Sequence, residues 1–209
     1  MRRGTIRADY DPDRALSILR AGLVAHVGVQ TDEGPLVLPM AYGVTDDTLY
    51  LHGALANSVL RAGQSREVCV TVTLLDGLVV GRSPFHNSMD YRCVVVRGEG
   101  RPVTDPDEHD RALRLISDHV VATWDTGREP TAAEVRRTQV LAVPLTEMST
   151  KVRTGGPGDE PEDLDGPHWG GHVPIEARFG APVGGEDLLA GRTVPPAVAA
   201  LEGRRVAAP

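Results

Sequence analysis

The chain has 209 residues, a length that favours a single domain with a substantial core. Its 22 Lys and Arg against 29 Asp and Glu give a formal net charge of -7, which argues against a nucleic-acid-binding protein because such proteins need a basic face. The two cysteines, Cys69 and Cys93, lie in apolar runs without the spacing of a zinc site, so buried thiols are expected.

The chain carries no recognisable targeting or membrane signal. Met1 to Thr5 are followed by no apolar stretch, so no signal peptide is expected. No run reaches the roughly 18 apolar residues of a membrane-spanning helix. We therefore expect a soluble, cytoplasmic protein with no membrane or nucleic-acid partner.

The first third of the chain predicts a helix followed by an antiparallel meander. Asp11 is a helix N-cap with Pro12 at the first helical position, and Gly22 is the expected stop. Three short strands are predicted next, over residues 23–30, 35–43 and 48–52. A small-residue turn then leads to Asn57 or Ser58, either of which can cap a short helix ending at Gly63.

A strand rich in β-branched residues follows over 67–75. Asp76-Gly77 after it is typical of a hairpin turn between two apolar runs, so 78–82 is expected to return alongside the strand. The next strand is predicted from Cys93 toward Val103. Gly98 and Gly100 within it predict a bulge or a bend at a barrel corner.

The densest polar constellation in the chain lies just before that strand. Its members are His86, Asn87, Ser88, Asp90, Tyr91 and Arg92. Polar side chains crowded at the mouth of an apolar strand favour a ligand site. The alternatives are a hairpin that uses Asn87, Ser88 and Asp90 for its turn, and an Arg92 that pairs internally with Asp90 or Glu99.

Two further helices and a last strand complete the body. Asp105 with Pro106 opens one helix, where Glu108 is expected to complete a capping box, and Thr131 with Glu134 forms a second capping box. The last strand is predicted over 138–145. Strands in hairpins with few helices between them predict a mainly β fold with flanking helices, built as a small antiparallel barrel.

The composition changes after Arg153. Residues 1–153 are expected to form the barrel domain, and 154–209 an extended Gly- and Pro-rich tail that packs on it and becomes disordered toward its end. Trp169 is expected to anchor this tail in a surface pocket.

Four short segments carry a family resemblance, in order Leu49-Tyr-Leu-His-Gly53, Val68-Cys-Val-Thr-Val-Thr73, Ser88-Met-Asp-Tyr-Arg92 and Lys151-Val-Arg-Thr-Gly155. Glu162-Asp163 and Trp169-Gly170 add to it. From about Ile6 to Pro174 the chain resembles the FMN-binding split-barrel proteins, in the pyridoxamine 5′-phosphate oxidase-like branch that includes the nitroimidazole-resistance reductases. The resemblance implies a six-stranded antiparallel split β-barrel that forms a homodimer with flavin at the dimer interface.

The resemblance also implies where the flavin lies. Its phosphate would lie near the turn after His52, and its ring along strands 37–42 and 71–73, with the partner subunit contributing Ser88 to Arg92 and the tail near Trp169. The cofactor-binding residues expected on this basis are Met40, His52, Asn57, Ser58, Arg61, Thr71, Thr73, Ser88, Arg92, Lys151, Arg153 and Trp169.

One position departs from the family pattern. Members usually carry Ser-Arg or His-Lys where this chain has Asn57-Ser58-Val59. Losing one charge-assisted hydrogen bond costs about 1.5–3 kcal/mol, roughly ten- to hundred-fold in affinity. Arg61, Arg66 or Arg92 of the partner subunit are the residues that can replace the missing cation.

The activity implied is that of an FMN-dependent oxidoreductase acting on a small organic substrate, with His86 and Tyr91 as catalytic residues. Lys151 and Arg153 would supply positive charge beside the reduced flavin. One alternative is a haem-binding split barrel with His52 or His86 as axial ligand. Another is a cofactor-free dimeric binding module. Apart from haem iron, no metal is expected, and neither a nucleophile elbow nor a Rossmann glycine motif is present.

Overall fold

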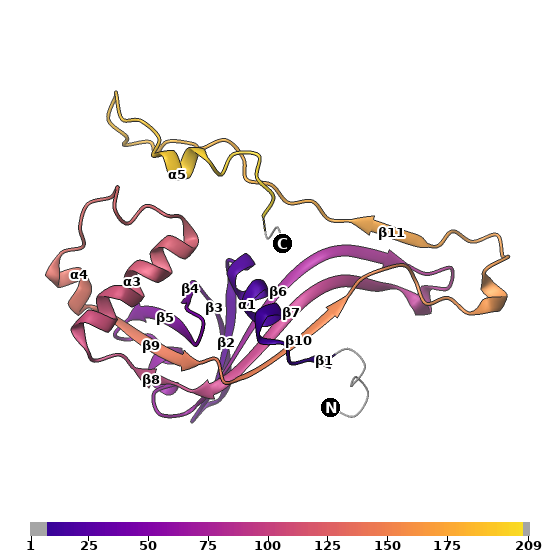
Figure 1. Cartoon of the computed structure of the whole chain (residues 1–209), viewed down its shortest axis with the longest axis horizontal. Helices are drawn as coiled ribbons and strands as arrows, with labels where there is room; N and C mark the ends of the chain where they lie inside the picture. The colour runs from indigo at the N-terminus through magenta and orange to yellow at the C-terminus, as the bar shows by residue number, and fades with distance from the viewer. Residues whose placement is uncertain (1–7, 207–209) are drawn as a thin grey trace.

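The computed structural model of the chain describes residues 8–206, in which two antiparallel sheets form the body (Figure 1). The larger sheet has the order β1 (Ala8–Asp9), β10 (Glu147–Arg153), β7 (Ser88–Glu99), β6 (Glu67–Val80), β2 (Ala25–Thr31) and β3 (Gly34–Met40), with β11 (Gly171–Pro174) also paired to β6. The smaller sheet has the order β4 (Tyr42–Val44), β5 (Thr48–Ala54), β9 (Thr138–Pro144) and β8 (Arg101–Pro102). The helices are α1 (Pro12–Ala21), α2 (Ser58–Ala62), α3 (Pro106–Val120), α4 (Ala132–Arg136) and α5 (Pro196–Ala199). The mainly β antiparallel fold predicted from the sequence is confirmed.

The core lies between the two sheets and is closed by α1. Strand β6 buries every second side chain from Val68 to Leu74, as a half-buried strand should, and its β-branched residues suit that pleated surface. Leu49 and Leu51 of β5 and Leu19 of α1 are fully buried opposite it. Of the helices in residues 8–206, none has the length and hydropathy to cross a membrane.

Helix starts follow the predicted capping chemistry, with one exception. The Asp11 carboxylate caps α1, and Thr131 with Glu134 forms a complete capping box on α4. The carboxylate of Asp105 accepts from the backbone N–H of Glu108, as predicted. The Glu108 carboxylate does not complete that box, because it accepts two hydrogen bonds from Arg101 instead.

The prediction of a hairpin turn at Asp76-Gly77 is wrong. Strand β6 runs unbroken for 14 residues and passes this dipeptide as a bulge, and the chain reverses only at the short 3₁₀ turn Pro84–His86. Asn87 closes that reversal by accepting from the backbone N–H of Gly81 at 2.9 Å. Strand β11 pairs with Gly77 to Val80, so the extended strand gains a partner that lies about 90 residues away in sequence and that no local pattern shows.

The predicted corner at Gly98 and Gly100 is confirmed. Strand β7 ends at Glu99 in the larger sheet, and β8 starts at Arg101 in the smaller one. A Cβ on Gly100 would lie 2.2 Å from the carbonyl oxygen of Gly63, so the chain can cross between sheets here only with glycine.

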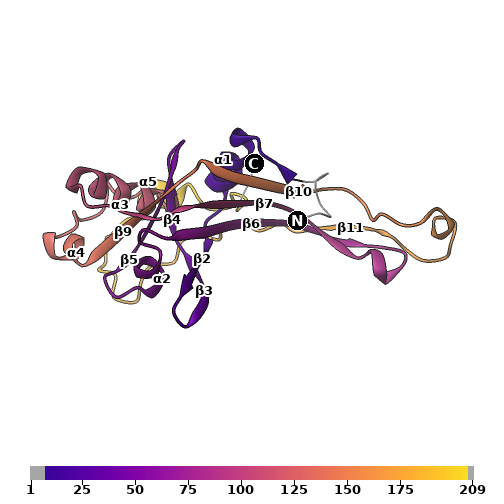
Figure 2. The same ribbon diagram turned by 90° about the horizontal axis from the view of Figure 1, so that it is seen from below.

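The long strands project from the body as an arm, which we define as residues 74–92 with 153–175 (Figures 1 and 2). At about 3.3 Å per residue, the 14 residues of β6 span roughly 45 Å, with the first half of the strand in the body and the second half in the arm. The arm tip is therefore far from the smaller sheet of the same chain.

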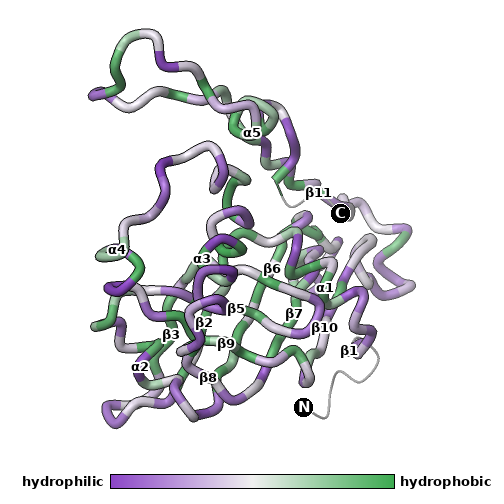
Figure 3. Tube along the Cα trace, turned by 60° about the vertical axis from the view of Figure 1, so that its left-hand side comes forward, coloured by the Kyte–Doolittle hydropathy of each residue, from purple (hydrophilic) through white to green (hydrophobic). Residues whose placement is uncertain are grey.

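Residues 177–206 form a separate loop, which we call the strap. It leaves β11, runs above the body through α5, and returns toward its starting point (Figure 3). Nearly all of its residues are exposed.

Candidate functional site

A cavity of about 680 Å³ lies beside the start of α2. Ser58, Arg61 and Arg66 line one side, and Asp32 and Glu33 line another. Arg66 is mostly exposed and lies 4.0 Å from Asp32, a loose pair that leaves its guanidinium able to bind an anion. The two arginines are thus in place to supply the positive charge that is missing at the usual family position.

Asn57, by contrast, is engaged in the fold. Its Oδ1 accepts from the backbone N–H of Leu60 at 3.0 Å and caps α2. Met40 is buried in the core at the end of β3, with 9% of its surface exposed. Of the residues considered for the phosphate, Ser58, Arg61 and Arg66 line the cavity and are exposed.

Four of the predicted residues share one open face of the larger sheet. Thr73 lies opposite Cys93, which in turn lies opposite Lys151, and Thr71 and Tyr91 follow at intervals of two along the same strands. The Lys151 Nζ lies 5.7 Å from the centre of the Tyr91 ring, which confirms that both side chains are on this side. Cys69 lies on this face as well and is exposed, so the expectation of a buried thiol is wrong there. Cys93 is half-buried, and burial raises its pKa.

The polar residues of the arm are tied to one another. The buried Asp90 carboxylate accepts from the Arg153 guanidinium at 2.5 Å, and the Nε2 of His172 lies 3.2 Å from its other oxygen. Arg153 also donates to the carbonyls of Gly155 and Gly156. Arg153, expected beside a flavin, therefore joins β10 to the tail.

Arg92 has a partner other than those proposed from the sequence. Its guanidinium donates from Nε and Nη2 to the two carboxylate oxygens of Asp76, at 2.9 and 2.7 Å. The suggested pairing with Asp90 or Glu99 is wrong, because the bulge in β6 brings Asp76 next to Arg92. This use of the guanidinium weakens the case for Arg92 as a phosphate ligand.

The arm tip carries the remaining predicted residues. His86 is half-buried beside the Phe85 ring, Ser88 is exposed at the start of β7, and Trp169 is 65% exposed. Trp169 does not anchor the tail in a pocket of this chain. Asp159 does so instead, since its buried carboxylate accepts from the backbone N–H and the Nη1 of Arg82.

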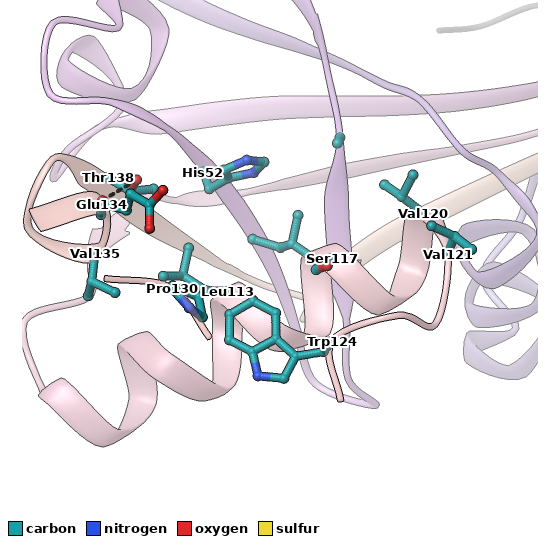
Figure 4. A pocket seen from close by; sticks show the side chains of 12 residues that line it. His52, Leu113, Ser117, Val120, Val121, Trp124, Pro130, Glu134, Val135 and Thr138 are labelled. Atoms are coloured by element: carbon teal, nitrogen blue, oxygen red, sulfur yellow. Dashed lines mark hydrogen bonds between the residues drawn. The ribbon is translucent and has the colours of Figure 1, made fainter. Parts of the chain in front are cut away.

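An apolar pocket of about 410 Å³ opens beside His52 of β5 (Figure 4). Helices α3 and α4 and the loop between them supply most of its wall: Leu113, Ile116, Ser117, Val120, Val121, Trp124, Pro130, Glu134 and Val135. The sequence pattern gave no sign of this wall, because Trp124 lies in an irregular loop more than 70 residues after His52.

His52 is the polar exception in that pocket. Its Nδ1 is buried and, among residues 8–206, has no hydrogen-bond partner. Burial lowers the pKa of His52, so the ring is neutral at pH 7. A neutral imidazole with an unpaired nitrogen beside an apolar cavity suits a ligand that accepts a hydrogen bond from the ring, or a metal centre that the ring nitrogen can coordinate.

One chain does not bring all these residues together. His52, Ser58 and Arg61 lie on the body, whereas His86, Ser88 and Trp169 lie at the tip of the arm (Figure 1). Any site that uses both sets needs a second copy to supply one of them.

Comparison with known proteins identifies relatives of this fold. A model of the family described as pyridoxamine 5′-phosphate oxidase matches residues 11–152. The flavocytochrome Anf3 from Azotobacter vinelandii is 31% identical, with a TM-score of 0.91 over 98% of this chain and 96% of its own. The FAD and heme binding protein from Mycobacterium smegmatis is 29% identical, with a TM-score of 0.89 over 96% of this chain and 98% of its own.

A third structure matches about two thirds of the chain. A candidate 5-nitroimidazole antibiotic resistance protein from Bacteroides thetaiotaomicron is 29% identical, with a TM-score of 0.58 over 69% of this chain and 86% of its own. Among curated proteins no match was found.

Proposed function

Because the chain belongs to the pyridoxamine 5′-phosphate oxidase family, we propose that it binds a flavin and acts as a flavin-dependent oxidoreductase on a small organic substrate. The observation that carries this proposal is the open sheet face on which Thr71, Thr73, Tyr91 and Lys151 lie together. A flat face with hydroxyl groups and one cation suits a planar heterocycle with polar edges.

Each residue has a task that its position supports. The hydroxyls of Thr71 and Thr73 can hydrogen-bond the ring edge, and the Lys151 ammonium can favour negative charge on it. Arg61 and Arg66, which line the cavity beside α2, would hold the phosphate by charge-assisted hydrogen bonds. The bound flavin supplies the electron transfer, and the protein binds and orients it.

The site is composite and needs a homodimer. The open face carries apolar side chains that remain 45–49% exposed in the described chain, namely Leu75, Leu78 and Met89. A second copy facing it would bring the partner's Trp169 toward the body. Trp169 then covers the flavin of the other copy, which accounts for its exposure here.

FMN is the flavin we propose, because Arg61 and Arg66 of the cavity beside α2 can together bind one phosphate group. The relative from Mycobacterium smegmatis binds FAD, so FAD is the alternative within the same class. Titration of the flavin-free protein with FMN and with FAD separates the two, and tighter binding of FMN is the expected result.

A second candidate function is haem binding in the pocket of His52. Two observations favour it: the unpaired buried Nδ1 of His52 and the apolar wall with Trp124. The two relatives described above that cover 98% and 96% of the chain are named as a flavocytochrome and as an FAD and heme binding protein. His86 is the weaker candidate for the axial ligand, because it lies at the exposed arm tip outside this pocket.

The absorption spectrum of the purified protein tests these functions. We expect flavin absorption in the blue, and a Soret band in addition if haem occupies the pocket of His52. The spectrum of His52→Ala then assigns the Soret band, while the flavin bands should persist. A colourless protein that takes up neither cofactor on reconstitution would instead support a cofactor-free binding module.

A further inference from the structure

We propose that the strap, residues 177–206, docks on a second copy of this chain and holds the two copies together. The inference deepens the homodimer put forward under the proposed function and rests on it. Its basis is the shape, the exposure and the origin of the strap.

The strap is a closed loop rather than a loose tail. Phe179 donates its backbone N–H to Arg204, Gly203 donates to Phe179, and Val206 donates to Ala177, with N to O distances between 2.9 and 3.0 Å. These bonds fix the two ends of the loop against each other at its base.

The apolar side chains of the strap beyond its base are exposed to a degree unusual for apolar residues. Val183 is 93% exposed, Leu189 69% and Leu188 56%, and Val194 is 50% exposed. A loop rich in Gly and Pro, with its aliphatic side chains far apart, buries little apolar surface through its own contacts, so these contacts do not offset the entropy lost on ordering it. A surface outside this chain is needed to bury them.

The strap also starts at the open face. Val206 and Ile175 line a cavity of about 300 Å³ together with His26 of β2 and Thr73 and Leu75 of β6. The base of the strap thus borders the face proposed for the flavin and the second copy. A strap that begins at the edge of the open face is in position to pass over a second copy packed on that face.

The total surface of the chain supports a second copy as the occupant. The accessible surface is 13531 Å² for a 22.3 kDa chain, whereas a compact monomer of that mass exposes about 9,400 Å². The ten residues outside the described range would add at most roughly 1,500 Å² by the same scaling, which leaves an excess of about 2,500 Å² or more. Obligate homodimers bury roughly 2,000–5,000 Å² in total, so the excess per copy is enough for a stable dimer.

The double variant Leu188→Asp/Leu189→Asp tests the proposal. Both residues are exposed in the single chain, so the fold of each copy should not change, but the charges would be buried on docking. We expect the dissociation constant of the dimer, measured by sedimentation velocity over a dilution series, to rise roughly tenfold or more. Leu55→Asp is the matched control, since Leu55 is 56% exposed on the body outside the strap, and it should dissociate like the wild type.

A second variant guards against an effect of charge alone. Replacing residues 180–202 by a short Gly-Ser link keeps the base at Phe179 and Gly203 and should weaken the dimer in the same way. A monomeric wild type, or both variants dimerising as tightly as the wild type, would overturn the proposal. So would variants that stay tightly dimeric but lose flavin, because the strap would then be a lid. The flavin content of the wild type is read independently, so failure of the proposed function remains distinguishable.

Discussion

Arg92 and Asp76 are joined by two hydrogen bonds across the β6–β7 pair, Nε to Oδ2 at 2.9 Å and Nη2 to Oδ1 at 2.7 Å. Both side chains are partly buried, at 21% and 33% exposure. The pair lies at the bulge in β6, where the backbone would otherwise be free to turn. It therefore holds the arm straight at the one point where the local sequence favours a reversal.

We predict that Arg92→Ala lowers the free energy of unfolding and leaves flavin affinity unchanged. Losing the pair costs about 1.5–3 kcal/mol, the range for a single hydrogen bond to a charged group, because solvent partly screens both side chains. Arg92→Lys should recover only part of the loss, because an ammonium lacks the two-pronged geometry. Chemical denaturation and flavin titration of the same samples decide the matter. Weaker flavin binding at unchanged stability would return Arg92 to the site.

We predict a larger loss of stability for Asp90→Ala. The Asp90 side chain is 5% exposed and the Arg153 side chain 11%, so the variant leaves a buried guanidinium without its carboxylate. Breaking such a pair from one side costs about 3–5 kcal/mol. Asp46→Ala, which breaks the exposed pair with Arg20, is the control and should unfold like the wild type. Hydrogen exchange should also speed up in β11, since Asp90 contacts His172. Equal stability of the two variants would refute this account of the arm.

Substitutions in the cavity beside α2 should weaken flavin binding in two cases and strengthen it in a third. Arg61→Ala and Arg66→Ala should each weaken flavin binding by about tenfold, the low end of the range for one charge-assisted hydrogen bond. Ser58→Arg should strengthen it, because it places a cation where family members usually carry one. Titration monitored by flavin fluorescence measures all three. If Ser58→Arg binds flavin no better and both alanine variants bind normally, the phosphate lies elsewhere.

His52 makes the stability depend on pH. Its pKa in the folded protein lies below the ordinary value of 6.5 because of burial. As the pH falls through 6.5 the unfolded chain takes up the proton first, so stability decreases until the lower folded pKa is passed. Burial lowers the pKa of His119 as well. We expect His52→Phe to be at least as stable as the wild type at pH 8, since it removes an unpaired buried nitrogen, and to lose less stability between pH 7 and 5. An unchanged pH slope would show that His52 is not buried in solution.

Features encoded by neighbouring residues could be predicted from the sequence. The caps at Asp11, Asp105 and Thr131 depend on side chains that reach only two or three positions along the chain. The corner at Gly98 and Gly100 was predictable for a similar reason, because glycine at a strand crossing marks a close backbone approach.

Features set by distant partners could not be predicted. Asp76-Gly77 has the composition of a turn, but Arg92 and β11 supply partners that favour an extended strand. The pocket of His52 depends on Trp124 from a loop with no periodic pattern. The family resemblance supplied the open face as a site, but it could not show that the arm places half of the predicted residues far from the other half.

Mixed dimers test the central claim, a flavin site shared between two copies, most directly. One copy carries Arg61→Ala/Arg66→Ala, which disables the cavity, and the other carries Ser88→Ala/Trp169→Ala, which disables the arm tip. Either variant alone should bind little flavin. A composite site leaves one intact site in each mixed dimer, so mixing and reassociating the two variants should restore about one flavin per dimer. If the mixed dimers form and bind no more flavin than the separate variants, each site lies within a single chain and the account is wrong.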